Sequence, residues 1–222
     1  MTTHFVNLLD ELRRRSLRMA SLVEDMLQES TEALITGDEA LARRVVQRDE
    51  EVDREEVAVE SEVIRLLALY QPVGSDLRLL CTILKVNNDL ERIADCAVNV
   101  AERVRRVHLG PGTPQIQQIR QLGAAVKQML RDAVQVYASE NASAADKVLA
   151  KDDTVDALYG QFVRGLIAEP SAAASSMGFS LDVLSIAKSL ERIADHATNI
   201  AEDVIFLSTG NIVRHQDRGR HG

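Results

Sequence analysis

Acidic side chains recur at helical spacing in two stretches of this 222-residue chain. In the first stretch Glu91, Asp95 and Asn99 are each four residues apart, and Glu102 follows three residues later. Each residue of an α-helix advances by about 100°, so these four side chains fall within roughly 80° of arc and form one polar stripe. The second stretch has the same residue types at the same spacing, at Glu191, Asp195, Asn199 and Glu202.

An acidic pair precedes each stripe. Asp49 and Asp53 are four residues apart, and so are Asp152 and Asp156. Like charges at this spacing on a helix repel each other by a few tenths of a kcal/mol. A bound cation would offset the repulsion, and carboxylate oxygens suit hard or borderline ions such as Mg, Ca, Mn and Fe, and Zn less well.

The two stretches belong to an internal repeat. The letters LERIAD occur at residues 90–95 and again at residues 190–195, an offset of 100, and the acidic pairs repeat at an offset of 103. Each half of the chain therefore carries the same two motifs in the same order, which indicates two copies of one structural unit.

A second interpretation of the acidic residues stays open. They can form a solvated face on which Arg92 and Arg192 supply local ion pairs. His196 follows the second stripe's Asp195, but the equivalent position in the first half is Cys96. A ligand that both halves require would recur, so we interpret His196 as a packed or solvated residue.

The elements that position these motifs are predicted to be helices. The chain is 45% hydrophobic but only 3% aromatic, and its abundant Ala, Leu, Arg and Glu favour helix. Gly and Pro cluster at a few places and divide the chain into six long segments with short connections, which predicts antiparallel neighbours. The expected fold is all-α, with two tandem, pseudo-symmetric three-helix bundles. Their expected bounds are residues 1–109 and 115–209, with a linker at 110–114 and a disordered tail at 210–222.

Composition excludes several classes of protein. A net charge of −8 and the absence of Trp argue against a nucleic-acid groove. Because no secretory signal or apolar run of about 18 residues is present, we expect a soluble, intracellular protein. Cys81 and Cys96 are too far apart along a helix for a disulfide. No phosphate-binding glycine loop or nucleophile motif occurs, so we expect no enzyme.

The two stretches LERIADCAVNVAE and LERIADHATNIAE, each preceded by its DxxxD helix, closely resemble the PhoU family of phosphate-specific transport system accessory proteins. The resemblance implies a pair of three-helix bundles, a cytoplasmic location, frequent homodimers and, in some members, multinuclear metal clusters. Two departures are Ala94 and Ala194, where many members have Gly, and Cys96, where His is common. The metal positions implied by the resemblance are Asp49, Asp53, Glu91, Asp95, Asp152, Asp156, Glu191 and Asp195, with Asn99, Glu102, Asn199 and Glu202 as weaker candidates.

The resemblance also implies a function. It predicts a negative regulator of the phosphate regulon that links the ATPase subunit of the phosphate ABC importer to the sensor histidine kinase, so that it meets the membrane only through its partners. The implied metal is Fe, Zn, Mg or Mn. Two alternatives stay open from the residues: a metal-dependent enzyme that acts on phosphate esters, and a structural helical scaffold.

Overall fold

The computed structural model describes residues 3–107, 114–168 and 174–213, and this part of the chain contains six α-helices and no strand. The helices are α1 (Thr3–Thr36), α2 (Glu39–Tyr70), α3 (Ser75–Arg103), α4 (Pro114–Ser139), α5 (Ala142–Ala168) and α6 (Ala174–Thr209). The expected all-α fold is confirmed. The linker expected at 110–114, except Pro114, and the tail from residue 214 onward lie outside the described residues.

The connections between helices form where the sequence predicts breaks. The Asp38 carboxylate caps α2 by accepting hydrogen bonds from the backbone N–H groups of Ala40 at 2.9 Å and Leu41 at 3.0 Å. Gly37 before it has a φ of 71°, a left-handed conformation that favours glycine. At the start of α5, the Asn141 side-chain oxygen accepts from the backbone N–H of Ala144 at 3.2 Å.

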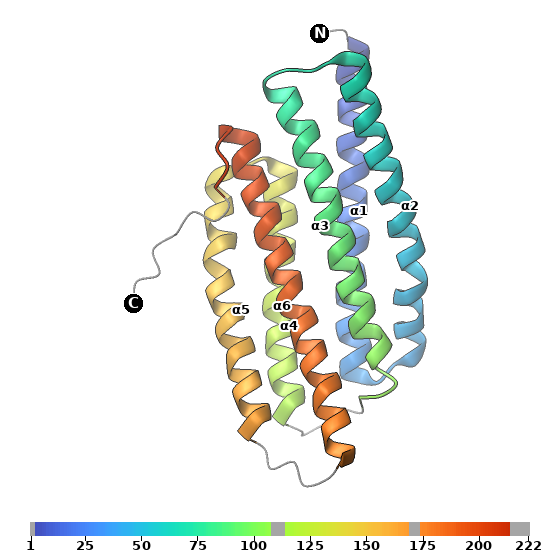
Figure 1. Ribbon diagram of the computed structural model, residues 1–222, viewed down its shortest axis with the longest axis vertical. Helices are drawn as coiled ribbons and strands as arrows, with labels where there is room; N and C mark the ends of the chain where they lie inside the picture. The colour runs from blue at the N-terminus through green and yellow to red at the C-terminus, as the bar shows by residue number, and fades with distance from the viewer. Residues whose placement is uncertain (1–2, 108–113, 169–173, 214–222) are drawn as a thin grey trace.

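Two three-helix bundles lie side by side, α1–α3 in one and α4–α6 in the other (Figure 1). Within each bundle all three helices pack against one another, and two contacts join the bundles, α3 with α6 and α1 with α4. The α3–α6 contact is the most extensive in the molecule, and the two helices run antiparallel at its centre (Figure 1). The helices that carry the LERIAD motifs therefore form the larger part of the interface between the repeats.

The apolar residues of both motifs face the core. The side chains of Leu90 and Leu190 are fully buried, as are those of Ile93 and Ile193. Burying a side chain of this size stabilises the fold by about 1.5–3 kcal/mol. The acidic residues of the same helices are thus forced onto the opposite, more exposed side.

Ion pairs cross the α3–α6 interface. Lys85 Nζ of α3 lies 3.1 Å from Asp203 Oδ1 of α6, and the Asp203 side chain is only 2% exposed. Near the other end of the interface, Arg103 Nε of α3 lies 3.8 Å from Asp182 Oδ1 of α6. In both pairs α3 supplies the cation and α6 the anion, which fixes how the two repeats align.

In the described residues, none of the helices combines the length and the apolar composition needed to cross a bilayer. Cys81 and Cys96 are both free thiols, as expected.

Candidate functional site

The first acidic group forms where α2 lies against α3. Asp49 and Asp53 come from α2, and Glu91 and Asp95 from α3. Partial burial, together with the negative charges of Asp53, Asp95 and Glu102, raises the pKa of Asp49 to about 6. Burial and the charge of Asp95 likewise raise the pKa of Glu91. The structure therefore brings the predicted carboxylates of the first repeat close enough to repel one another.

The second repeat reproduces this group where α5 lies against α6. Burial raises the pKa of Asp195 to about 6, with further contributions from the charges of Glu191 and Asp152. Burial and the charge of Asp156 raise the pKa of Asp152, although a hydrogen bond from Thr198 Oγ1 at 3.4 Å acts in the opposite direction. The four predicted carboxylates of this half are again gathered on two neighbouring helices.

Basic side chains pair with some of these carboxylates. Arg92 Nε lies 3.2 Å from Glu91 Oε2, and its Nη1 lies 3.4 Å from Asp95 Oδ2. In the second repeat Lys188 pairs with Glu191. The local ion pairs expected of Arg92 are thus present, whereas in the second repeat Lys188 takes the role expected of Arg192. These pairs occur beside the mutual repulsion expected for a cation site.

The donor chemistry of both acidic groups suits a hard divalent cation, because all the donors are carboxylate oxygens that repel one another. In the part of the chain that the structure describes, however, no three His, Cys, Asp or Glu side chains approach closely enough to hold a metal ion. The carboxylates would have to turn toward a common point, and Arg92 and Lys188 would have to release them, for a cation to be enclosed.

The weaker candidates make other contacts. Asn99 Nδ2 donates to the backbone carbonyl of Asp95 at 2.9 Å, within its own helix. Asn199 Nδ2 instead donates across the repeat interface to Asp89 Oδ1 at 3.1 Å. Glu102 is exposed and adds its charge to the group around Asp49, whereas Glu202 is half-buried on α6. The two stripes are therefore alike in sequence and different in their contacts.

Sequence reasoning did not identify a polar network at the repeat interface. His196 Nδ1 lies 2.8 Å from Asp89 Oδ1, and the Asp89 side chain is only 6% exposed. A cleft of about 480 Å³ adjoins the network, with Glu56, Glu60 and Lys85 among its lining residues. Asp89 corresponds to Ser189 in the second repeat, so no repeated pattern could have revealed the network. From the sequence we interpret His196 as packed or solvated, and the structure places it largely buried beside Asp89.

The raised pKa values predict that the stability of the protein depends on pH when a chelator keeps metal ions away from these carboxylates. A carboxyl group whose pKa is higher in the folded than in the unfolded protein stabilises the fold when it is protonated. This stabilisation is complete below the unfolded-state pKa, which is about 4 for Asp. It is lost as pH rises through the folded-state pKa of about 6. Asn stays neutral at every pH. We therefore expect Asp49→Asn and Asp195→Asn each to raise the free energy of unfolding at pH 8 by up to about 1 kcal/mol, a limit set by solvent screening.

Urea unfolding of wild type and both variants at pH 4 and pH 8 measures this effect. At pH 4 the three proteins should be equally stable. Variants that are less stable than wild type at pH 8 in chelator would show that the carboxylates form net favourable contacts and do not repel one another.

Comparison with known proteins places this fold and these motifs in a class of duplicated helical bundle proteins. The sequence profile of the PhoU domain matches twice, at residues 16–104 and 119–204. The chain belongs to the PhoU family.

Relatives and solved structures match over nearly the whole chain. A phosphate-specific transport system accessory protein PhoU homolog from Clostridium acetobutylicum is 35% identical over 206 residues, covering 92% of this chain and 94% of the relative. One from Pseudomonas putida is 38% identical over 208 residues, with 93% and 81% covered. The crystal structure of PhoU from Pseudomonas aeruginosa superposes with a TM-score of 0.88 at 36% identity, with 93% of this chain and all of that chain covered (100%). The phosphate transport system regulatory protein PhoU from Streptococcus pneumoniae gives 0.86 at 29% identity, with 94% and 99% covered.

Proposed function

We propose that this protein is a regulatory accessory protein of phosphate transport. The strongest support is that both repeats of the chain match the PhoU domain. Relatives also align with more than nine tenths of this chain and of their own length. The names of those relatives describe accessory proteins of the phosphate-specific transport system. One solved structure with the same fold is described as a phosphate transport system regulatory protein.

We further propose that the protein contacts two partners. The protein would act in the cytoplasm as a homodimer, bind the ATPase subunit of the phosphate ABC importer and the sensor histidine kinase of the phosphate regulon, and hold the kinase in its repressing state when phosphate is plentiful. Long, rigid helices with charged outer faces suit such a role, because they offer extended docking surfaces that change little on binding. The proposal includes no catalytic step, since the sequence contains no nucleophile or phosphate-loop motif.

Divalent cations form part of the proposal. Fe, Zn, Mg or Mn would be held by the two acidic groups, which consist of Asp49, Asp53, Glu91 and Asp95, and of Asp152, Asp156, Glu191 and Asp195. The support is the donor chemistry, together with the burial and the mutual repulsion that raise the pKa values of Asp49 and Asp195. A bound cation would neutralise that repulsion and tie α2 to α3, and α5 to α6.

Binding measurements with purified components test the partner proposal. Isothermal titration of the untagged protein with the ATPase subunit, and separately with the cytoplasmic part of the kinase, should give a saturable heat with each of them. The serum protein albumin serves as the unrelated control. Absence of binding to both partners, with and without added divalent cation, would contradict the proposal.

A further inference from the structure

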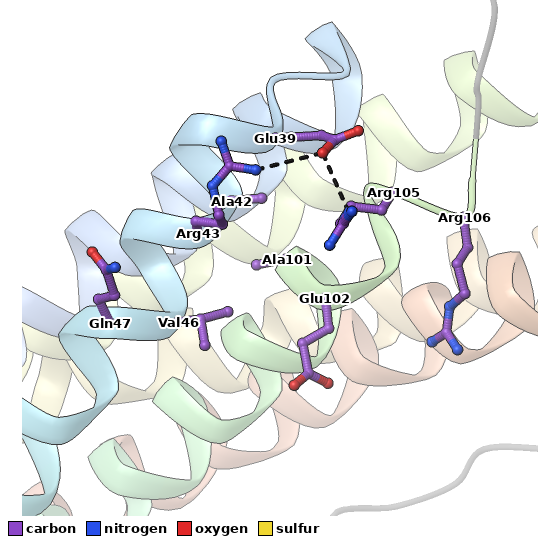
Figure 2. A pocket seen from close by; sticks show the side chains of 9 residues that line it. All are labelled: Glu39, Ala42, Arg43, Val46, Gln47, Ala101, Glu102, Arg105 and Arg106. Atoms are coloured by element: carbon purple, nitrogen blue, oxygen red, sulfur yellow. Dashed lines mark hydrogen bonds and ion pairs between the residues drawn. The ribbon is translucent and has the colours of Figure 1, made fainter.

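A pocket of about 620 Å³ opens between the start of α2 and the end of α3. Its lining includes none of Asp49, Asp53, Glu91 and Asp95, although Glu102 lines it and adds its charge to the group around Asp49. Ala42 and Val46 of α2 and Ala101 of α3 give it an apolar floor, and charged side chains surround this floor (Figure 2). The volume lies within the range of about 300–1,000 Å³ that is typical of binding sites for small groups. An apolar centre within a polar rim is also the usual composition of a protein–protein contact.

The rim of the pocket has more arginine than its own acids neutralise. The Glu39 carboxylate lies 3.5 Å from Arg43 and 3.3 Å from Arg105, so one carboxylate pairs with two guanidinium groups (Figure 2). Arg106 shares Asp182 with Arg103 in the same way, at 3.4 Å and 3.8 Å. Glu102 is the remaining acidic residue of the lining. The rim therefore has a local excess of positive charge, although the whole chain carries a charge of −8.

The arginines are particular to the first repeat. With the offsets of the two repeated motifs, Arg43 corresponds to Asp146, and Arg105 and Arg106 correspond to Ile205 and Phe206. Ile205 is buried, and the Phe206 ring packs under Lys85 with the ammonium 4.7 Å from the ring centroid. The second repeat thus uses the positions of Arg105 and Arg106 for packing and has an exposed acidic residue, Asp146, at the position of Arg43. The first repeat instead has arginines at all three positions, around an open pocket.

The three arginine side chains of the rim are exposed to solvent, so a binding partner can reach them. The Arg43, Arg105 and Arg106 side chains are 60%, 70% and 59% exposed. Their shared carboxylates hold them in place, which lowers the entropy that each arginine loses when it binds a second carboxylate. Val46 at the floor is also partly exposed.

We propose that this pocket, lined by Arg43, Arg105, Arg106 and the apolar floor at Val46, is a docking site for a protein segment that carries carboxylates beside an apolar side chain. Carboxylates of the segment would pair with the guanidinium groups in a forked geometry, while the apolar side chain would cover Ala42, Val46 and Ala101. A free phosphate ion would gain nothing from that floor, so the lining favours a peptide. The inference rests on the proposed function, because it assigns a surface to the partner contact.

The double variant Arg43→Gln, Arg105→Gln tests the site, because both residues are exposed and glutamine keeps their length. A second variant, Val46→Glu, adds a negative charge to the floor and leaves the arginines in place. Arg65→Gln is the matched control, since Arg65 is an exposed arginine of α2 that pairs with Glu62 and lies outside the pocket. The probes are the purified ATPase subunit and the purified cytoplasmic part of the kinase, each titrated in 50 mM and 200 mM salt.

For at least one probe we expect both pocket variants to raise Kd tenfold or more, with a melting temperature equal to that of wild type. Arg65→Gln should keep the wild-type Kd, and added salt should weaken wild type more than the double variant. If all four proteins bind with equal Kd, the pocket is not the docking site and the proposed function stands. If wild type binds neither probe, the proposed function fails and this inference fails with it.

Discussion

Replacing Lys85 by Met is expected to lower the free energy of unfolding by about 3 kcal/mol, because it removes the ammonium from a buried carboxylate. Asp203 is almost fully buried on α6, and Lys85 reaches it from α3 across the interface between the repeats. Met fills nearly the same space without charge, so packing is largely kept. The loss therefore measures the electrostatic cost of leaving Asp203 inside the protein without this partner. In a protein of this size it corresponds to a decrease of roughly 6–12 °C in melting temperature.

A double-mutant cycle separates this cost from lost packing. Asp203→Asn removes the buried charge, so the Lys85→Met, Asp203→Asn protein should be at least about 1 kcal/mol more stable than Lys85→Met alone. Lys127→Met is the control, since Lys127 donates to Gln28 at the surface and its loss should cost less than about 0.5 kcal/mol. Urea unfolding of wild type, both single variants, the double variant and the Lys127→Met control gives all five values. A loss below about 1 kcal/mol for Lys85→Met would show that this ion pair does not hold the repeats together.

Divalent cation is expected to raise the free energy of unfolding of the chelator-treated protein by about 3 kcal/mol for each acidic group that binds it, at a concentration one hundred times its Kd. The proposed reason is that the cation binds the folded carboxylate groups and not the unfolded chain. The Asp95→Asn, Asp195→Asn double variant removes one predicted ligand from each group and should lose most of this increase. In chelator the same variant should be no less stable than wild type.

Thermal unfolding with Mg, Mn, Fe(II) or Zn added singly to chelator-treated protein measures the effect. Asp25→Asn is the control, because Asp25 is an exposed residue of α1 that pairs with Arg48 at 3.6 Å. Its response to each cation should equal that of wild type. Equal responses from wild type and the double variant would mean that the two acidic groups bind no cation and are solvated, ion-paired faces.

The sequence predicts the repeated part of this structure well, for a simple reason. Helical periodicity places Leu90 and Ile93 on one face and Glu91 and Asp95 on another, and the structure has the same division between core and surface. The apolar spacing and the acidic spacing are both local in sequence, and each occurs in both repeats. The turn at Gly37 and Asp38 is local as well, and the capping contacts confirm it.

The contacts between the repeats could not be predicted in this way. Asp89 pairs with His196 over 107 residues of chain, and its equivalent in the second repeat is Ser189. Lys85 similarly corresponds to Ser185. Such pairs break the internal symmetry and have no periodic signature, so only the packing of α3 against α6 reveals them. The ion pairs that separate the carboxylates, such as Arg92 with Asp95, depend on side-chain conformations that sequence spacing does not determine.

Deleting the gene and measuring a phosphate-starvation reporter in phosphate-rich medium tests the regulatory function most directly. We expect the reporter to be switched on constitutively in the deletion strain and silenced again by the wild-type gene supplied in trans. The Arg65→Gln gene provides a second, matched complementation control. A reporter that stays silent in the deletion strain when phosphate is plentiful would contradict the proposal that this PhoU-family protein represses the phosphate regulon.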